Sequence, residues 1–393
     1  MFNFEYYTPT KVLFGKDVEN RVGELVKACG SKKVLIHYGG KSAVKSGLIE
    51  RVEASLKEAG VPFVTLGGVV PNPHLSMVRE GIELGKSEGI DFILAVGGGS
   101  VIDSSKAIAY GIAEPDKDVW ELFSHKRKAQ KCLPLGVVLT IAAAGSEMSD
   151  SCVITNTETG EKRGCNSNLV RPKFALMNPE LTMTLPDYQT ESGCVDIMMH
   201  TMERYFTQGG NMEITDEIAE GLIRTVMKNA VILHNDPNNY DARAEVMWAS
   251  SLSHNGLTGC GNRGNDFASH ALEHELGGMF DVTHGAGLAA IWSSWARYVY
   301  RDCLPRFVKF AVNVMKVAPC ENDEDAALAG IEAMEEFYRS INMPTNLHEL
   351  GIDPTDEQIM AMSRSLIAGK GGSYGAAKLL NEDDTIAIYR MAL

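Results

Sequence analysis

The order of apolar and polar positions changes in character partway along the 393-residue chain. In the first half, short apolar runs alternate with stretches whose apolar residues recur every three or four positions. Such runs predict buried strands, and the wider spacing predicts helices. The expected strands are Lys33–Tyr38, Val61–Leu66, Asp91–Val96 and Leu133–Thr140, and helices are expected over Ser46–Ala59 and His74–Glu88. This alternation predicts a mainly parallel sheet covered by helices.

Long amphipathic stretches replace the strands after Leu185-Pro186. Their apolar residues recur at helical spacing. The six stretches are Tyr188–Phe206, Glu213–Asn235, Asp241–His254, Asn265–Gly277, Leu304–Lys316 and Asp325–Asn342. We therefore expect residues 1–186 to form an α/β domain and residues 187–393 to form an all-helical domain.

Composition excludes several classes of function. The net charge is −14, from 37 basic and 51 acidic residues, which argues against a nucleic-acid partner because binding needs a basic face. The eight cysteines form no C-x-x-C pair, and their scatter favours reduced thiols in the cytoplasm. We see neither a signal peptide nor an apolar stretch of about 18 residues that would predict a membrane span.

Two polar residues interrupt an apolar helical face within Cys194–His200. Asp196 and His200 are four positions apart, so their side chains share one face of the helix, one turn apart. An anion and an imidazole in an apolar run need partners, because burying them unpaired is costly. They are either each other's partner, as a buried ion pair, or two ligands of a metal ion.

Three of the ten histidines lie within 15 residues further along the chain. His270 and His274 share one helix face, and His284 follows in a glycine-rich turn, where glycines beside it would let the backbone approach a metal. Imidazole and carboxylate ligands suit Fe(II), Zn(II), Mn(II) or Co(II). Spacing alone leaves open whether His270 or His274 is the ligand.

A glycine-rich turn follows the expected strand Asp91–Val96. It comprises Gly97, Gly98, Gly99 and Ser100, with Asp103 one turn later. Glycines at this place let backbone N–H groups hold a pyrophosphate at a helix N-terminus. The alternative is a plain strand-to-helix turn in which Ser100 and Asp103 form a capping box. The pattern is not G-x-G-x-x-G, so a standard Rossmann fingerprint is not present.

These motifs together resemble the iron-containing (group III) alcohol dehydrogenases, in their butanol dehydrogenase-like branch, over the whole chain. The motif residues are Gly193, Asp196, His200, His270, His274, His284-Gly285-Ala286-Gly287-Leu288-Ala289 and the turn Gly97–Ser100 with Asp103. The resemblance implies a Rossmann-like dinucleotide-binding domain and a helical metal-binding domain. It implies that Asp196, His200, His270 and His284 bind the metal, and that His274 lies near the reacting centre without binding it. At that place His274 is expected to be the catalytic residue that relays a proton, and the alternative is a hydrogen-bond partner that orients a ligand.

Further cofactor contacts are implied by the same resemblance. Thr140 follows the fourth expected strand, and Ala144 stands where the family often has threonine. Lys162 would reach the ribose near the nicotinamide, and Leu181 would pack beside the nicotinamide ring. The alternatives are a solvated loop lysine for Lys162 and a core leucine for Leu181.

The segment after the first expected strand bears on the choice between NAD and NADP. An acidic residue there would bind the ribose 2′-hydroxyl and repel a 2′-phosphate. The sequence has instead Gly39, Gly40, Lys41 and Ser42. The glycines and Ser42 leave room, and Lys41 would neutralise a phosphate. We therefore expect NADP(H) to be preferred and NAD(H) to be accepted.

The expected activity is hydride transfer between NAD(P)H and a short-chain aldehyde such as butyraldehyde, with the metal as Lewis acid, in a cleft between the domains. A glycerol or diol dehydrogenase is the nearest alternative. A dehydroquinate synthase-type cyclase would need basic residues near the metal, and the ligand segments are apolar and acidic instead. Phe2, Phe4 and Tyr6 alternate with polar residues like an edge strand, which by resemblance would pair across a homodimer.

Overall fold

The computed structural model describes residues 1–393, apart from the side chain of Lys41. The chain forms two compact units, one of Tyr7–Leu185 and one of Pro186–Leu393 together with Met1–Tyr6. The sequence placed the first six residues in the α/β domain, whereas the structure places them in the helical unit. The expected edge strand is absent as well, because residues 1–10 have no regular secondary structure. The backbone N–H of Phe2 donates instead to the carbonyl of Gly261, at 3.0 Å.

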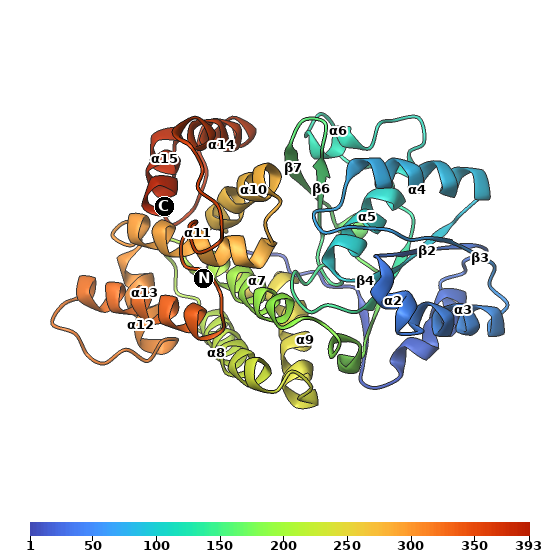
Figure 1. Cartoon of the computed structure of the whole chain (residues 1–393), viewed down its shortest axis with the longest axis horizontal. Coiled ribbons are helices and arrows are strands. Elements are labelled where there is room, and N and C mark those ends of the chain that lie inside the picture. The colour runs from blue at the N-terminus through green and yellow to red at the C-terminus, as the bar shows by residue number, and fades with distance from the viewer. The chain divides into compact units, whose positions relative to one another are not determined.

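A six-stranded parallel sheet lies at the centre of the α/β unit, in the order β1-β8-β5-β4-β2-β3 (Figure 1). Its strands are β1 (Lys11–Phe14), β2 (Val34–Tyr38), β3 (Phe63–Leu66), β4 (Phe92–Gly97), β5 (Leu135–Leu139) and β8 (Phe174–Met177). The four strands expected from the sequence are β2, β3, β4 and β5. A separate antiparallel pair consists of β6 (Ser151–Asn156) and β7 (Glu161–Asn166).

Helices cover both faces of this sheet because the strands are apolar on both sides. Leu35 packs into a core with α4 and α5, whereas its neighbours Val34 and Ile36 pack into a second core with α1 and α3. Period-two alternation thus sends successive apolar residues to opposite faces. The helices are α1 (Val22–Ala28), α2 (Lys41–Lys45), α3 (Leu48–Glu58), α4 (Leu75–Glu88), α5 (Gly99–Ala113) and α6 (Trp120–Phe123), with 3-10 turns η1 (Val18–Arg21), η2 (Asn168–Val170) and η3 (Pro179–Thr182).

The second unit is helical, as expected. Its elements are α7 (Asp187–Tyr205), α8 (Glu213–Asn235), α9 (Tyr240–His254), η4 (Leu257–Gly259), α10 (Ala268–Phe280), α11 (His284–Val299), α12 (Leu304–Asn313), α13 (Asp323–Ser340), α14 (Asp356–Gly369) and α15 (Glu382–Met391). Helix α7 packs against α8, α9 and α11 and is buried along most of its length. The sequence missed α11 because this helix is buried nearly all round, so it shows no polar stripe.

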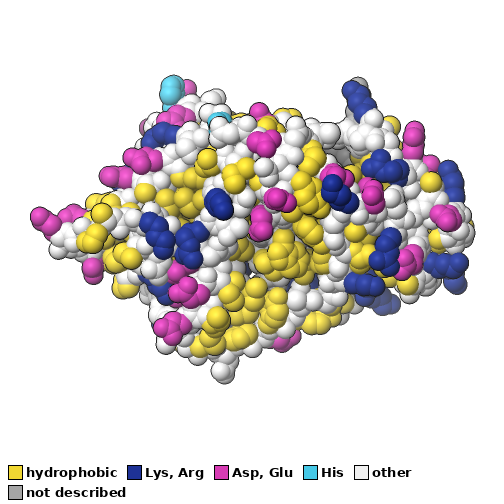
Figure 2. Space-filling view, turned by 90° about the horizontal axis from the view of Figure 1, so that it is seen from below, with side chains coloured by type: hydrophobic (Ala, Val, Ile, Leu, Met, Phe, Trp, Pro, Cys, Tyr) yellow, Lys and Arg dark blue, Asp and Glu magenta, His cyan; other side chains and the backbone are white. Residues whose placement is uncertain are grey.

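Figure 2 shows acidic and basic side chains interspersed with apolar ones over the face that it displays, without a continuous basic stripe. Within the part of the chain that the structure describes, no helix is both long and apolar enough to cross a bilayer.

Candidate functional site

Helix α7 carries the first pair of candidate ligands in a buried position. Asp196 is 3% exposed and His200 is 5% exposed. The Nδ1 atom of His200 lies 3.0 Å from the backbone carbonyl oxygen of Asp196 and 3.0 Å from its Oδ1. The contact predicted from the four-residue spacing is therefore confirmed. A proton on Nδ1 can donate to that carbonyl and leaves the lone pair on Nε2.

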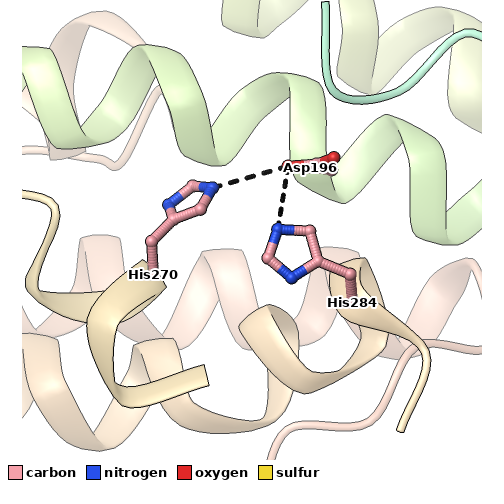
Figure 3. Close-up of side chains that lie close together, drawn as sticks. All are labelled: Asp196, His270 and His284. Carbon is pink, nitrogen blue, oxygen red and sulfur yellow. Dashed lines mark ion pairs between the residues drawn. The ribbon is translucent and has the colours of Figure 1, made fainter. Parts of the chain in front are cut away.

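Two further imidazoles converge on the same carboxylate oxygen from other helices. The Nε2 atoms of His270, in α10, and His284, at the start of α11, lie 3.6 Å and 3.8 Å from Asp196 Oδ1 (Figure 3). These separations are long for hydrogen bonds. They are close to the ~3.4 Å that separates two ligand atoms bound to one tetrahedral ion at ~2.1 Å each. The three residues therefore have the arrangement of metal ligands, and their ligand atoms lie within 4.8 Å of one another.

Two atoms of this cluster are buried without a hydrogen-bond partner. They are Oδ1 of Asp196 and Nε2 of His270. A buried polar atom left without a partner is costly and needs an explanation. A divalent ion between them accounts for both atoms at once, and mixed oxygen and imidazole donors suit iron, zinc or manganese. Asp196, His270 and His284 therefore fit the metal that the motifs imply, whereas His200, the fourth expected ligand, is not part of this group.

Two buried glutamates that the sequence analysis missed orient the imidazoles. Glu203 of α7 contacts Nδ1 of His270 and accepts a hydrogen bond from its backbone N–H at 3.0 Å. Glu273 of α10 contacts Nδ1 of His284. Each imidazole thus turns Nδ1 to a carboxylate and Nε2 toward Asp196, the usual arrangement of histidine ligands. The signal in the sequence was a glutamate within an apolar helical stretch. Such a carboxylate becomes buried on folding and then needs a partner.

These carboxylates also set the proton affinity of the site. Burial lowers the pKa of His270, but the carboxylates of Glu203 and Asp196 outweigh burial and raise the pKa to about 9. Burial raises the pKa of Asp196, yet the imidazoles of His200 and His284 hold it well below its usual value. Asp196 is therefore an anion at neutral pH. Such a site attracts a cation.

His200 has a different environment from the other two histidines. Its ring lies edge-on to His254, with centroids 3.9 Å apart, and 4.4 Å from the ring of His270. Arg204, 6% exposed, lies 3.3 Å from Nδ1 of His254 through Nη2 and donates to the carbonyl of His200 through Nη1 at 2.5 Å. His254 was missed by the sequence analysis, since only the packing of α9 on α7 brings it here.

His274 lies one turn after His270, on the same helix. Its ring centroid is 6.3 Å from that of His270 and 5.7 Å from that of His284. Its ligand atom groups with those of Glu273 and His284, whereas that of His270 groups with Asp196. The structure thus distinguishes two histidines that the spacing left equivalent.

The glycines that follow His284 have a packing role. His284 begins helix α11 rather than lying in a turn. A Cβ atom on Gly285 would lie 2.0 Å from the backbone oxygen of Ser192 in α7, and one on Gly287 would lie 2.9 Å from the side chain of Glu273. These glycines let α11 pack closely on α7 and α10, which fixes His284 beside Asp196.

In the α/β unit, the glycine turn joins β4 to α5 as predicted. Gly98 is the N-cap of α5, and no side chain caps the helix, so the expected capping box of Ser100 and Asp103 is wrong. A Cβ atom on Gly97 would lie 2.5 Å from Val101, and one on Gly98 would lie 2.8 Å from Ile141. Packing alone therefore requires glycine at both positions, and the long helix offers its N-terminus to an anion.

The ends of three neighbouring strands meet at this turn. After β5, the N–H of Thr140 donates to the carbonyl of Gly97 at 3.1 Å. After β2, a Cβ atom on Gly39 would lie 3.6 Å from Val101 in the first turn of α5. Gly40 and Ser42 are exposed, and the side chain of Lys41 lies outside the described residues. Cofactors bind at this edge of parallel sheets.

Three other predicted cofactor residues have defined surroundings. Asp103 accepts hydrogen bonds from the Ser146 hydroxyl at 2.6 Å and from the Val153 N–H at 2.9 Å. Lys162 is 8% exposed within β7, so the solvated-loop alternative is wrong. Leu181 packs against the apolar core on one face of the sheet, as its alternative interpretation expected. The cofactor contacts of all three stay predictions.

Comparisons with known proteins cover both units. Residues 9–179 match the model of the iron-containing alcohol dehydrogenase family, and residues 190–393 match that of the C-terminal part of the Fe-containing alcohol dehydrogenase family.

Relatives match over almost the whole chain. NADH-dependent butanol dehydrogenase A of Clostridium acetobutylicum is 39% identical over 391 residues, covering 99% of each chain. NADPH-dependent aldehyde reductase YqhD of Escherichia coli is 37% identical over 362 residues, covering 90% of each chain. The crystal structure of NADH-dependent butanol dehydrogenase A from Thermotoga maritima superimposes with a TM-score of 0.95 at 39% identity, covering 100% of this chain and 99% of that one.

Replacing Glu203 by glutamine should weaken metal binding about 10- to 100-fold, because the amide no longer anchors His270 with a negative charge. His270→Ala and His284→Ala should lose the metal. Metal content after dialysis and competition with a chelator measure both effects.

Glu191→Gln is the matched control for the glutamate. Glu191 is buried in the same helix and pairs with a histidine, His234, at 2.5 Å, but it contacts none of the candidate ligands. Unchanged metal affinity in a folded Glu203→Gln variant would contradict the role of this carboxylate.

Proposed function

The chain belongs to the iron-containing alcohol dehydrogenase family, and we propose that it interconverts short-chain aldehydes, such as butyraldehyde, and their alcohols with a nicotinamide cofactor. The observation that carries this proposal is the convergence of Asp196, His270 and His284, with two buried ligand atoms left unsatisfied. Two relatives, a butanol dehydrogenase and an aldehyde reductase, support this substrate class. The apolar character of the ligand-bearing helices favours a small, neutral substrate.

We propose that Asp196, His200, His270 and His284 hold one divalent ion, Fe(II) in the first instance, with Zn(II) or Mn(II) as substitutes. When bound, the ion supplies Lewis acidity toward the substrate oxygen. Glu203 and Glu273 hold the imidazoles in one orientation, so that Nε2 of each stays available. The close packing around Gly285 keeps the ligands from spreading, which preserves the geometry through the reaction.

His274 is proposed to move the proton. Reduction of an aldehyde delivers a hydride to the carbonyl carbon and a proton to the oxygen, and oxidation reverses both. His274 is half-buried beside His270 and His284. One of its ring nitrogens is therefore placed to exchange a proton with the substrate oxygen or with a water molecule.

The α/β unit is proposed to bind the dinucleotide. The first turn of α5, with Gly97, Gly98, Gly99 and Ser100, holds the pyrophosphate through backbone N–H groups. Thr140 lies beside that turn, and Asp103 shapes the neighbouring segment. Lys162 would approach the ribose and Leu181 the nicotinamide.

Preference for NADPH is proposed from the segment after β2. A Cβ atom on Gly40 would meet nothing within 4 Å, so there is room beside the ribose. The segment from Tyr38 to Ser42 has no carboxylate to repel a 2′-phosphate. The names of relatives include both NADH- and NADPH-dependent enzymes, so the residues of this segment carry the argument.

The purified protein, loaded with Fe(II) or Zn(II), should oxidise NADPH when butyraldehyde is added. The kcat/KM should be higher with NADPH than with NADH, and higher for butyraldehyde than for glycerol or small diols. Absorbance at the nicotinamide band measures each pair. A failure with every aldehyde in the metal-loaded protein would contradict the activity, and a preference for NADH of about tenfold would contradict the cofactor assignment alone.

His274→Ala should lower kcat while the metal content stays that of the unchanged protein, because the residue transfers a proton and does not bind the ion. The expected loss is about 100-fold or more, the usual contribution of general acid–base catalysis. Rate measurements and elemental analysis of the same preparation test both statements. Loss of the metal would identify His274 as a ligand instead.

We also propose that the chain forms a homodimer through its N-terminal segment. Phe2, Phe4, Tyr6 and Tyr7 are 43%, 53%, 41% and 49% exposed. So many large apolar side chains in seven residues leave a surface that another protein surface would bury. A second copy of this chain supplies a self-complementary partner.

Light scattering should therefore give twice the 42.8 kDa of one chain. Phe4→Ser combined with Tyr6→Ser should shift the mass toward the monomer, because both changes remove apolar area that the dimer would bury. Ile214→Ser is the control, since Ile214 is 64% exposed in the helical unit and outside the segment. A monomeric mass for the unchanged protein at micromolar concentration would contradict the dimer.

A further inference from the structure

A fully buried lysine lies in the α/β unit, and the reaction itself does not use it. Lys106 is in α5, two turns after the glycine turn, and none of its surface is exposed to solvent. Its Nζ donates to the backbone carbonyls of Ser146, Ser149 and Ser151, at 2.8, 3.1 and 2.7 Å. Burying an ammonium group is costly unless it is fully partnered. Here three backbone carbonyls of one irregular segment supply the partners.

A serine hydroxyl links this ammonium group to its counter-charge. Ser146 Oγ lies 2.9 Å from Nζ of Lys106 and donates to Oδ1 of Asp103 at 2.6 Å. The other oxygen of Asp103 accepts the N–H of Val153 at 2.9 Å. Lysine and aspartate therefore balance each other within α5 while both bind the segment that follows β5.

A second cation, from a residue later in the chain, binds the same segment. Arg171 donates to the carbonyl of Met148 at 2.6 Å, and its guanidinium lies 3.7 Å from the carboxylate of Asp150. Together with Lys106 it holds four carbonyls between Ser146 and Ser151. The segment has no regular secondary structure before β6, so these contacts replace the backbone hydrogen bonds of a helix or sheet.

The chain on each side of this fixed segment contacts residues that are proposed to bind the cofactor. At its start, Ile141 and Ala144 pack on Gly98 and Gly99, where added Cβ atoms would lie 2.8 and 3.2 Å away. At its end, Ser151 begins β6, which pairs with β7 so that Thr155 lies opposite Lys162.

We propose that Lys106 is a positioning residue for the nicotinamide dinucleotide, which acts by anchoring residues 146–151 and thereby setting the segment after β5 against the glycine turn. This inference rests on the proposed dinucleotide site. Lys106 itself touches no cofactor. Its role is to fix the shape of the surface that does, and the ammonium of lysine does so because its three N–H donors are shared among the three carbonyls and the Ser146 hydroxyl.

Lys106→Met keeps an unbranched side chain, one heavy atom shorter, and removes its donors. In the metal-loaded enzyme, this variant should raise the Kd for NADPH, followed by its fluorescence, and the KM for NADPH by about tenfold or more. The metal content and the KM for butyraldehyde should change much less. A general defect of folding would move all of these together, so the split distinguishes positioning from bulk stability.

Ser146→Ala provides a second variant if Lys106→Met does not fold. It removes the hydroxyl link to Asp103 but leaves the ammonium and its carbonyls, so the Kd should rise in the same direction by a smaller factor. Ser105→Ala is the control. Ser105 is fully buried in the same helix, and its hydroxyl donates to the carbonyl of Val101, at 2.7 Å, within the helix itself. Its Kd should not change.

The outcomes separate this inference from the function on which it rests. If the unchanged protein binds neither NADPH nor NADH, the dinucleotide site itself is wrong. If it binds them and the folded variants Lys106→Met and Ser146→Ala bind equally well, the inference about Lys106 is overturned. A parallel loss of metal, aldehyde affinity and cofactor affinity would overturn it as well.

Discussion

The helical unit is organised around one buried carboxylate, that of Asp196, whose Oδ1 has no hydrogen-bond partner within the protein. Asp196 lies in the middle of α7, and its Oδ1 faces imidazoles from α10 and α11 at distances too long for hydrogen bonds. An anion in such a place is stable only with a compensating cation. A divalent ion is one such cation, and the donor set of Asp196, His270 and His284 fits it.

The neighbouring packing keeps this carboxylate and its imidazoles in place. Glu203 and Glu273 link α7 to α10 and α10 to α11 through the histidines. Gly285 allows the backbones of α11 and α7 to approach closely, so that the ligands cannot drift apart. The site is therefore rigid because the helices that carry it are bound to each other through the same residues that orient the ligands.

The α/β unit also uses a buried charge, in this case to fix the path of an irregular segment. Its parallel sheet brings the ends of β2, β4 and β5 to one edge, where the helix α5 begins. The irregular segment after β5 has no ladder to define its path, and the buried charge of Lys106 defines it instead. In both units, buried charges are partnered by groups at or beside the proposed binding sites.

The sequence by itself determined the α/β and helical character of the two halves, the glycine turn and the spaced Asp and His pairs that are candidate metal ligands. These follow from local spacing, since strand and helix periodicities and i, i+4 pairs need no knowledge of the fold. Spacing could not separate His270 from His274, and it took Ser100 and Asp103 for a capping box. Only the tertiary structure showed Glu203, Glu273, His254 and Lys106 at their partners. Those contacts join residues that lie 40 or more positions apart, except for Glu273 and His284, and no local pattern specifies which helices will pack together.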